Sequence, residues 1–212
     1  MSFTILYNYY YFNSTSDENN YSVCTMFTYN QFNFMFTGDL EESGESKLVS
    51  YYDGSTPAKT LPKVELFKAG HHGSKTSTNA DLLKKIEPEI VCVCCCAGGS
   101  EYTNYYQNTF PTQDMINRVA KYTDRVYVTT MYDISKKTYG SLNGNIIISS
   151  NGNNIGVSAT NNTKKLKDSD WFNTTIYANS SGQYCSGKGK TDFYTSATSG
   201  VTPKPQRTWP TK

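Results

Sequence analysis

Histidine is scarce in this chain: its 212 residues include only two, the adjacent His71 and His72. A metal centre built from three or more of its own imidazoles is therefore excluded. Long apolar runs are also lacking. No stretch approaches the roughly 18 apolar residues that span a bilayer, and the first residues do not show the basic-then-apolar pattern of a secretory leader. We therefore expect no membrane partner.

Net charge is small as well. Lys and Arg total 20 and Asp and Glu total 18, which leaves a net charge of +2 and an isoelectric point near 8.1. Nothing in this balance demands nucleic acid or an anionic surface as a partner. The paired lysines at 84–85, 136–137 and 164–165 are better explained as solvated faces than as binding patches. Nucleic acid stays open as a partner, without support from the charge.

Four of the six cysteines are crowded into residues 92–96. Alternate side chains of a strand point to opposite faces, so these thiols could not converge on one metal ion without a sharp turn. We expect a buried strand that uses Cys as a small hydrophobe. So many thiols favour a cytoplasmic location, whereas the wealth of Asn, Ser, Thr and Tyr is typical of secreted or cell-surface proteins. The location therefore stays unknown.

Aromatic residues carry much of the expected core, with 18 Tyr and 10 Phe concentrated in strand-like runs. The expected strands cover residues 6–12, 21–29, 32–36, 64–69, 90–95 and 125–130, and the expected helices cover residues 41–52, 78–86 and 111–122. This alternation, with short connections, favours an α/β (α+β layered) fold in which a sheet packs against helices.

A polar region follows. Residues 142–150 and 153–159 predict a hairpin across Asn151-Gly152, a dipeptide that favours tight turns. Residues 160–212 are rich in Asn, Thr, Ser, Gly and Lys, with a few apolar anchors such as Trp171, Phe172 and Trp209. We expect two parts: a domain over residues 1–159 and an irregular extension over residues 160–212.

Candidate metal ligands follow two of the expected strands. Thr37-Gly38-Asp39 ends one strand, and Gly70-His71-His72-Gly73 ends the next. A carboxylate and imidazoles on neighbouring strand ends suit zinc or manganese. Taken singly, Asp39 could instead cap the following helix, and the histidine pair could be structural. We expect His71 to be the ligand and His72 to orient or protonate substrate.

Two further residues of this loop, Ser74 and Lys75, are candidates for contacting a substrate phosphate. A hydroxyl that bonds its own loop and a solvated lysine explain them equally well.

These motifs resemble the metallo-β-lactamase superfamily, and most closely the soluble domain of the DNA-uptake channel ComEC. The resemblance rests on Thr37-Gly38-Asp39, on Leu40-Glu41-Glu42 with Glu45, and on the His71–Lys75 segment, and it runs from about residue 20 to about residue 155. It implies the carboxyl-terminal half of an αββα sandwich, with a mixed sheet and helices on one face. It also implies a two-metal site, of Zn or alternatively Mn, in which Asp39 bridges the ions and a histidine of the pair completes one shell.

The superfamily's first motif, His-x-His-x-Asp-His, has no counterpart here, because both histidines belong to the second motif. The chain therefore resembles either a fragment, which we favour, or a relative that lost its catalytic half. On the first hypothesis it is part of a phosphodiesterase-like hydrolase whose partner is the missing amino-terminal half. We expect the isolated chain to be inactive and to hold no metal firmly, and to self-associate or to pack residues 160–212 over the uncovered sheet.

A second departure favours another function. Relatives of ComEC often have a His-Pro pair before the next helix, and this chain has Phe110-Pro111. The alternative hypothesis is therefore a non-catalytic binding or structural module on a degenerate metallo-β-lactamase scaffold.

Overall fold

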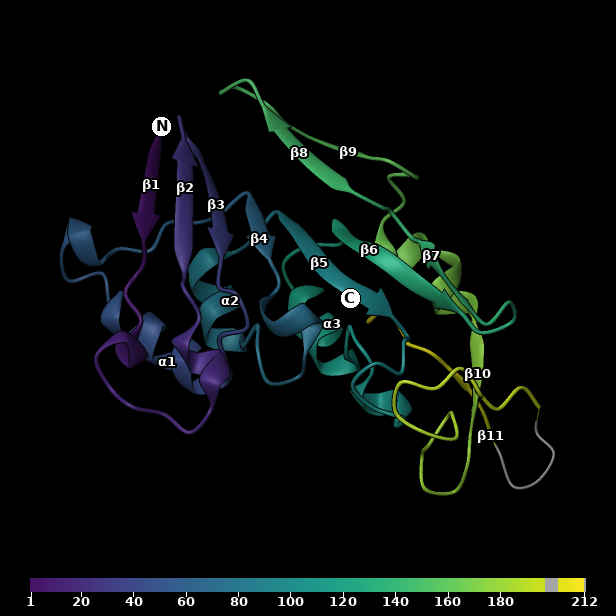
Figure 1. Cartoon of the computed structure of the whole chain (residues 1–212). Coiled ribbons are helices and arrows are strands. Elements are labelled where there is room, and N and C mark those ends of the chain that lie inside the picture. The colour runs from purple at the N-terminus through teal and green to yellow at the C-terminus, as the bar shows by residue number, and fades with distance from the viewer. Residues whose placement is uncertain (197–201, 212) are drawn as a thin grey trace.

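The computed structural model describes residues 1–196 and 202–211. Its centre is a seven-stranded mixed sheet in which the strands lie in chain order (Figure 1). The strands are β1 (Ser2–Ile5), β2 (Thr25–Tyr29), β3 (Phe32–Phe36), β4 (Leu66–Lys68), β5 (Ile90–Ala97), β6 (Val126–Asp133) and β7 (Thr138–Ser141). Pairing is parallel from β3 to β6 and antiparallel at both ends of the sheet.

Helices α1 (Glu42–Tyr51), α2 (Ala80–Ile86) and α3 (Gln113–Val119) cover one face of the sheet (Figure 1). The side chains of Asn79 and Thr112 cap α2 and α3 by accepting hydrogen bonds from backbone N–H groups. The apolar residues at helical spacing are buried against the sheet: Leu48, Leu82, Leu83, Ile86, Met115, Ile116 and Val119. The predicted α/β layering and the three predicted helices are confirmed.

A second layer, the hairpin of β8 (Ile146–Ser150) and β9 (Ile155–Ala159), lies over part of the other face (Figure 1). Its apolar residues pack on the sheet residues Leu66, Ile90, Cys92 and Tyr127. The hairpin is confirmed, but β8 begins at Ile146 and the connection has four residues instead of two. Asn151 closes that turn because its side chain accepts hydrogen bonds from the N–H groups of Asn153 and Asn154.

At the ends of the sheet, one prediction was wrong and one strand was missed. The aromatic run at residues 6–12 is not a strand, since Tyr9–Tyr11 forms a 3-10 helix. Asn8 stabilises this bend through an accepted bond from Tyr10 and donated bonds to the carbonyls of Asn20 and Ser22. Strand β7 was missed because its four residues are all exposed and carry no apolar alternation. Other short 3-10 segments are Glu18–Tyr21, Pro57–Lys59, Gly70–Gly73, Tyr106–Asn108 and Leu166–Asp168.

The described part of the carboxyl-terminal extension is folded onto the domain. It contains α4 (Asp170–Asn173) and the strand pair β10 (Thr175–Ala178) and β11 (Thr202–Pro205). Trp171 and Leu166 are fully buried in the main core beside the helices. The extension thus packs beside β6 and α3 and does not cover the sheet face over β1–β3. Residues 197–201 and 212 of the predicted extension lie outside the described residues.

None of the helices in residues 1–196 and 202–211 has the length and apolar character needed to cross a bilayer. The candidate site lies at the carboxyl ends of the parallel strands β3 and β4.

Candidate functional site

Asp39 and the histidine pair meet because they follow neighbouring parallel strands. Phe36 of β3 lies opposite Lys68 of β4, so the segments after these strands leave the sheet at the same edge. Gly38 makes the turn to Asp39 at a φ of 58°. A Cβ at this position would lie 2.9 Å from Ser22 Oγ, the atom that accepts the hydrogen bond from the Asp39 N–H. Glycine is therefore needed at position 38.

His72 faces Asp39 across a short gap, with Nε2 3.5 Å from the carboxylate Oδ2. Its other ring nitrogen, Nδ1, lies 2.7 Å from the carbonyl oxygen of Cys94. A carbonyl can only accept, so Nδ1 carries the proton. In the neutral imidazole the lone pair of Nε2 then points toward Asp39, and two acceptors face each other. A cation bound to both atoms would offset the repulsion between them.

His71 belongs to a different pair. Its Nδ1 lies 2.6 Å from Glu41 Oε1, and its backbone N–H donates to the carbonyl of Gly38. Both side chains are largely buried, at 23% and 13% exposure. A carboxylate that holds Nδ1 leaves Nε2 free, which is the usual arrangement around a metal-ligating histidine. Glu41, which the sequence analysis named only as part of the resemblance, thus lies within the candidate site.

Both histidines have left-handed backbone conformations, with φ of 42° at His71 and 56° at His72. Such conformations are unfavourable for residues other than glycine and persist where the surroundings enforce them. Thr78 accepts a hydrogen bond from the Gly70 N–H before the turn, and the Ser74 N–H donates to the carbonyl of His71 after it. The strained turn places the two rings toward different acidic partners.

Beneath this turn lies Glu45, whose carboxyl is fully buried. It accepts hydrogen bonds of 2.7 Å from the N–H groups of Thr78 and Asn79. Burial raises the pKa of this carboxyl to about 8, although the two hydrogen bonds and the nearby Arg118 act in the opposite direction. Glu45 therefore links α1 to the loop that supports the histidines.

Lys68 is a cation within the site that sequence analysis did not single out. Its Nζ lies 3.9 Å from Asp39 Oδ1 and donates to the carbonyl of Gly38 at 3.3 Å. It balances part of the charge on Asp39. The sequence alone did not indicate a role for Lys68, because its position near Asp39 depends on the register between β3 and β4.

Ser74 and Lys75, the predicted substrate contacts, line a hollow of about 340 Å³ beside His71. Ser74 Oγ is engaged within its own loop, 2.9 Å from Thr76 Oγ1. Lys75 Nζ donates to Asn108 Oδ1 at 3.2 Å. The structure thus places both residues near the site, and their contact with a substrate stays a prediction.

The donors of the candidate site form pairs and not a closed metal shell. Within the described ranges, no three side chains of His, Cys, Asp or Glu are grouped as a metal ion would need. Asp39 with His72 and Glu41 with His71 form two separate acid–imidazole pairs. The residue types fit zinc or manganese, but each pair supplies fewer donors than the four that close a zinc shell.

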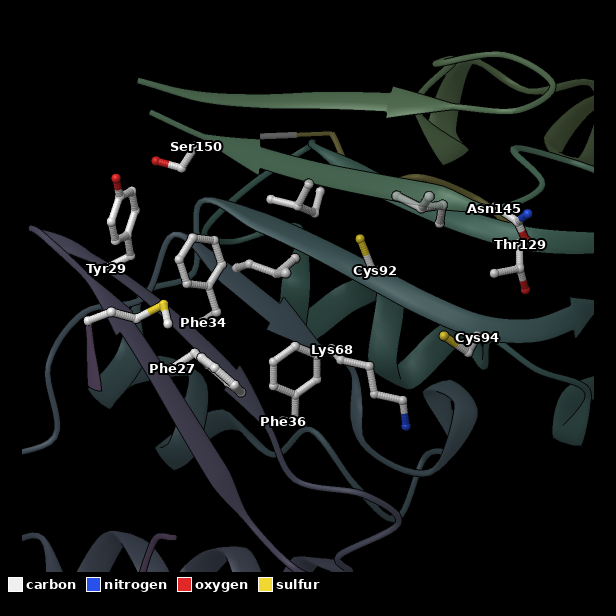
Figure 2. A pocket seen from close by; sticks show the side chains of 14 residues that line it. Phe27, Tyr29, Phe34, Phe36, Lys68, Cys92, Cys94, Thr129, Asn145 and Ser150 are labelled. Atoms are coloured by element: carbon white, nitrogen blue, oxygen red, sulfur yellow. The ribbon is translucent and has the colours of Figure 1, made fainter. Parts of the chain in front are cut away.

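The cysteine cluster forms strand β5, as predicted, but one of its cysteines is exposed and two are half-buried. Cys92 is buried, whereas Cys94 is exposed, and both line a groove on the sheet face (Figure 2). The register of β5 shifts between Val93 and Cys96. Cys95 then packs on the main core and Cys96 packs on the smaller cluster around Tyr132. Burial raises the pKa of the Cys92 thiol to about 12. The expectation that all four thiols are shielded was wrong for Cys94.

This groove, of about 780 Å³, lies between the sheet and the β8–β9 hairpin (Figure 2). Its walls are mainly apolar, with the rings of Phe27, Phe34 and Phe36 on one side and Ile146 and Ile148 on the other. Lys68 and Cys94 line it too, and both contact the Asp39–His72 pair, through Lys68 Nζ and the Cys94 carbonyl. The apolar groove therefore leads to the candidate site.

Comparison with known proteins shows similarity to competence proteins. Competence protein ComA of Neisseria gonorrhoeae is 35% identical over 85 residues, which are 40% of this chain and 10% of that protein. Recombination protein 2 of Haemophilus influenzae is 27% identical over 117 residues, or 55% of this chain and 13% of that protein. ComE operon protein 3 of Bacillus subtilis is 27% identical over 78 residues, or 37% and 9%.

No family model matches the chain. The matched segments span about a tenth of the length of these relatives. The chain is thus similar to one part of competence proteins of the ComEC type.

Proposed function

We propose that this chain is the carboxyl-terminal part of a metal-dependent hydrolase of the metallo-β-lactamase superfamily, with a phosphodiester as its substrate. The observation that carries the proposal is the Asp39–His72 pair, in which a carboxylate oxygen and an imidazole nitrogen lie 3.5 Å apart while the Cys94 carbonyl fixes the ring. A divalent ion is the natural occupant between two such acceptors.

Each side chain then has a defined task. Asp39 and His72 would hold one zinc or manganese ion, and His71, held by Glu41, would offer Nε2 to a second. The metals, when bound, supply Lewis-acid stabilisation of a phosphoryl oxygen. Lys68 limits the negative charge at Asp39 when substrate approaches, and Glu45 keeps the strained histidine turn in place.

The remaining metal ligands must come from another polypeptide segment, and we propose that it packs on the uncovered sheet face. Phe3 is 55% exposed, Ile5 61% and Phe27 40%, so the first two strands present an apolar surface to solvent. This surface is continuous with the groove that leads to Lys68. An apolar face of this kind favours association, and its proposed partner is the amino-terminal half that the resemblance implies.

A first test is the coding sequence upstream of Ser2. A His-x-His-x-Asp-His motif there supports the hydrolase, and its absence contradicts it. A chain extended by that segment should hydrolyse bis(4-nitrophenyl) phosphate with added zinc or manganese, and Asp39→Asn should abolish turnover. The chain without it should show none, and metal-dependent turnover by the chain alone would overturn the claim that its site is incomplete.

A second candidate function is a non-catalytic module on the same scaffold. Phe110 favours it, because this apolar ring lies 6.1 Å from the His72 ring, where relatives often have a histidine. An extended chain that binds metal, folds and yet hydrolyses no phosphate, sulfate or carboxylate ester would support this alternative.

A further inference from the structure

Three rings form a continuous aromatic surface beside the candidate metal ligands. The centroids of Tyr102 and Phe110 lie 5.2 Å apart, and those of His72 and Tyr102 lie 6.2 Å apart with an angle of 21° between the rings. The Phe110 ring is inclined by 26° to His72. We call Tyr102, Phe110 and His72 the aromatic shelf.

The aromatic shelf is accessible to solvent. Tyr102 is 56% exposed and Phe110 is half-buried. Tyr102 and Phe110 are tilted by 46° to each other, so a planar ring that stacks on the exposed Tyr102 face meets Phe110 at an angle. Offset stacking and tilted ring contacts both remove apolar surface from water and are favoured by the ring quadrupoles.

The position of Phe110 is fixed by the backbone on both sides. Its carbonyl accepts a hydrogen bond from the Gly98 N–H at 3.0 Å, and the next residues are tied by the bond from the Thr112 N–H to the Gly73 carbonyl. The Arg207 guanidinium also donates to the Pro111 carbonyl at 2.9 Å. A ring held in this way loses little conformational entropy when it binds.

The hollow next to the shelf carries positive charge. Lys75 lies on its wall together with the neutral polar side chains of Thr103 and Asn108, and no carboxylate lines it. Among the ion pairs of the described residues, none includes Lys75, whose ammonium donates to the Asn108 amide oxygen instead. The ammonium is therefore available to an anionic group.

We infer that this hollow binds a phosphate ester that carries a planar aromatic ring, with the ring stacked on Tyr102 and packed against Phe110 and the phosphate beside Lys75. The inference rests on the proposed function for the identity of the reacting group, and it specifies the substrate class. Nucleotides and simple aryl phosphates share this chemistry. Aliphatic phosphate esters lack the ring and would gain only the contact with Lys75.

The test is a binding measurement without metal, in the presence of EDTA. Titration calorimetry or ligand NMR compares adenosine monophosphate, 4-nitrophenyl phosphate and glycerol 3-phosphate on the same chain. We expect the two aromatic esters to bind roughly tenfold more tightly than glycerol 3-phosphate, as one stacked ring provides. Equal affinity for all three, or no measurable binding of the aromatic esters, would overturn the inference.

Substitutions test which residues contact the aromatic ring and which contact the phosphate. Tyr102→Leu and Phe110→Leu should each remove most of the preference for aromatic esters, while Tyr139→Leu, a matched change of an exposed tyrosine on β7, should leave it intact. Lys75→Gln should weaken all three esters together. A preference that survives both shelf variants would contradict the inference. Equal affinities for the adenosine and nitrophenyl esters assign the preference to one stacked ring; tighter binding of the adenosine ester shows that the larger base adds contacts.

The result is separable from the proposed function. Asp39→Asn removes a metal ligand and contacts the shelf only through His72. It leaves Tyr102, Phe110 and Lys75 in place, so it should preserve the aromatic preference. Failure of metal binding by the extended chain, with an intact aromatic preference, would contradict the hydrolase proposal alone. Metal binding by the extended chain without any aromatic preference would contradict this inference alone.

Discussion

Arg207 holds Thr109 in place from almost a hundred residues further along the chain: its Nη2 lies 2.9 Å from Thr109 Oγ1 and also donates to the carbonyl of Tyr106 at 3.0 Å. The guanidinium is buried, and its Nε donates to the carbonyl of Pro111. Burial lowers the pKa of Arg207 to about 10. The carboxyl-terminal extension therefore supports the loop that carries Phe110.

Loss of this guanidinium should destabilise the fold. Arg207→Ala leaves several buried carbonyl groups without donors, and each costs about 1–3 kcal/mol. We expect the free energy of unfolding in urea to fall by at least about 2 kcal/mol, with Arg207→Lys only partly restoring it because an ammonium cannot reproduce the planar fork. The exposed change Lys188→Ala is the control. Equal stability of Arg207→Ala and this control would contradict the assignment.

Glu45 should make stability depend on pH. Its pKa is raised from 4.5 to about 8 by burial, so the folded state binds its proton more tightly than the unfolded state. Stability from this group is complete below about pH 4.5 and is lost as pH rises toward about 8. We expect Glu45→Gln to flatten this decline in urea denaturation across that range, whereas the exposed Glu18→Gln should not. A decline of the same size in Glu45→Gln would show that another group causes it.

Thiol labelling should distinguish the cysteines. Cys94 is exposed on the groove, whereas Cys24 and Cys92 are buried and their thiol pKa values are raised by burial to about 12. A maleimide should therefore label Cys94 first in the native state, and the buried thiols only after unfolding. Mass spectrometry of Cys94→Ser is the control and should show the rapid phase gone. Rapid native labelling of Cys92 would contradict the burial of β5.

The uncovered sheet face should promote self-association. Phe27 and Phe36 are both partly exposed on the groove side of β2 and β3. We expect light scattering to show association that rises with concentration and that decreases in the double variant Phe27→Ser/Phe36→Ser. Phe12→Ser, which alters a more exposed ring outside the groove, should associate like the parent. A parent chain that stays monomeric at all concentrations would contradict the prediction that this face drives association.

The sequence predicted those features that depend on local pattern. Leu82, Leu83 and Ile86 at helical spacing after the Asn79 cap placed α2, and the linked Asp and His-His motifs placed the site at the strand ends. The sequence did not predict the long-range contacts. The partner of His72 is the backbone carbonyl of Cys94, which any residue type would supply.

Two other outcomes depended on three-dimensional context. Cys94 is exposed because the hairpin covers only part of the sheet, while the sequence shows only an apolar run at residues 90–95. Trp171 was read as an anchor in a polar extension and is a fully buried core residue. Its partners are scattered over the chain, so no short window contains the signal.

The most direct test of the central claim is an NMR titration of the two histidine rings with zinc at neutral pH. The account predicts weak, saturable shifts of the His72 ring that are lost in Asp39→Asn, because two donors form only part of a zinc shell. The matched change Asp53→Asn, an exposed aspartate after α1, should leave them unchanged. Zinc shifts at His72 that persist in Asp39→Asn, or zinc binding without any change at His72, would contradict the claim that Asp39 and His72 form one metal-binding pair.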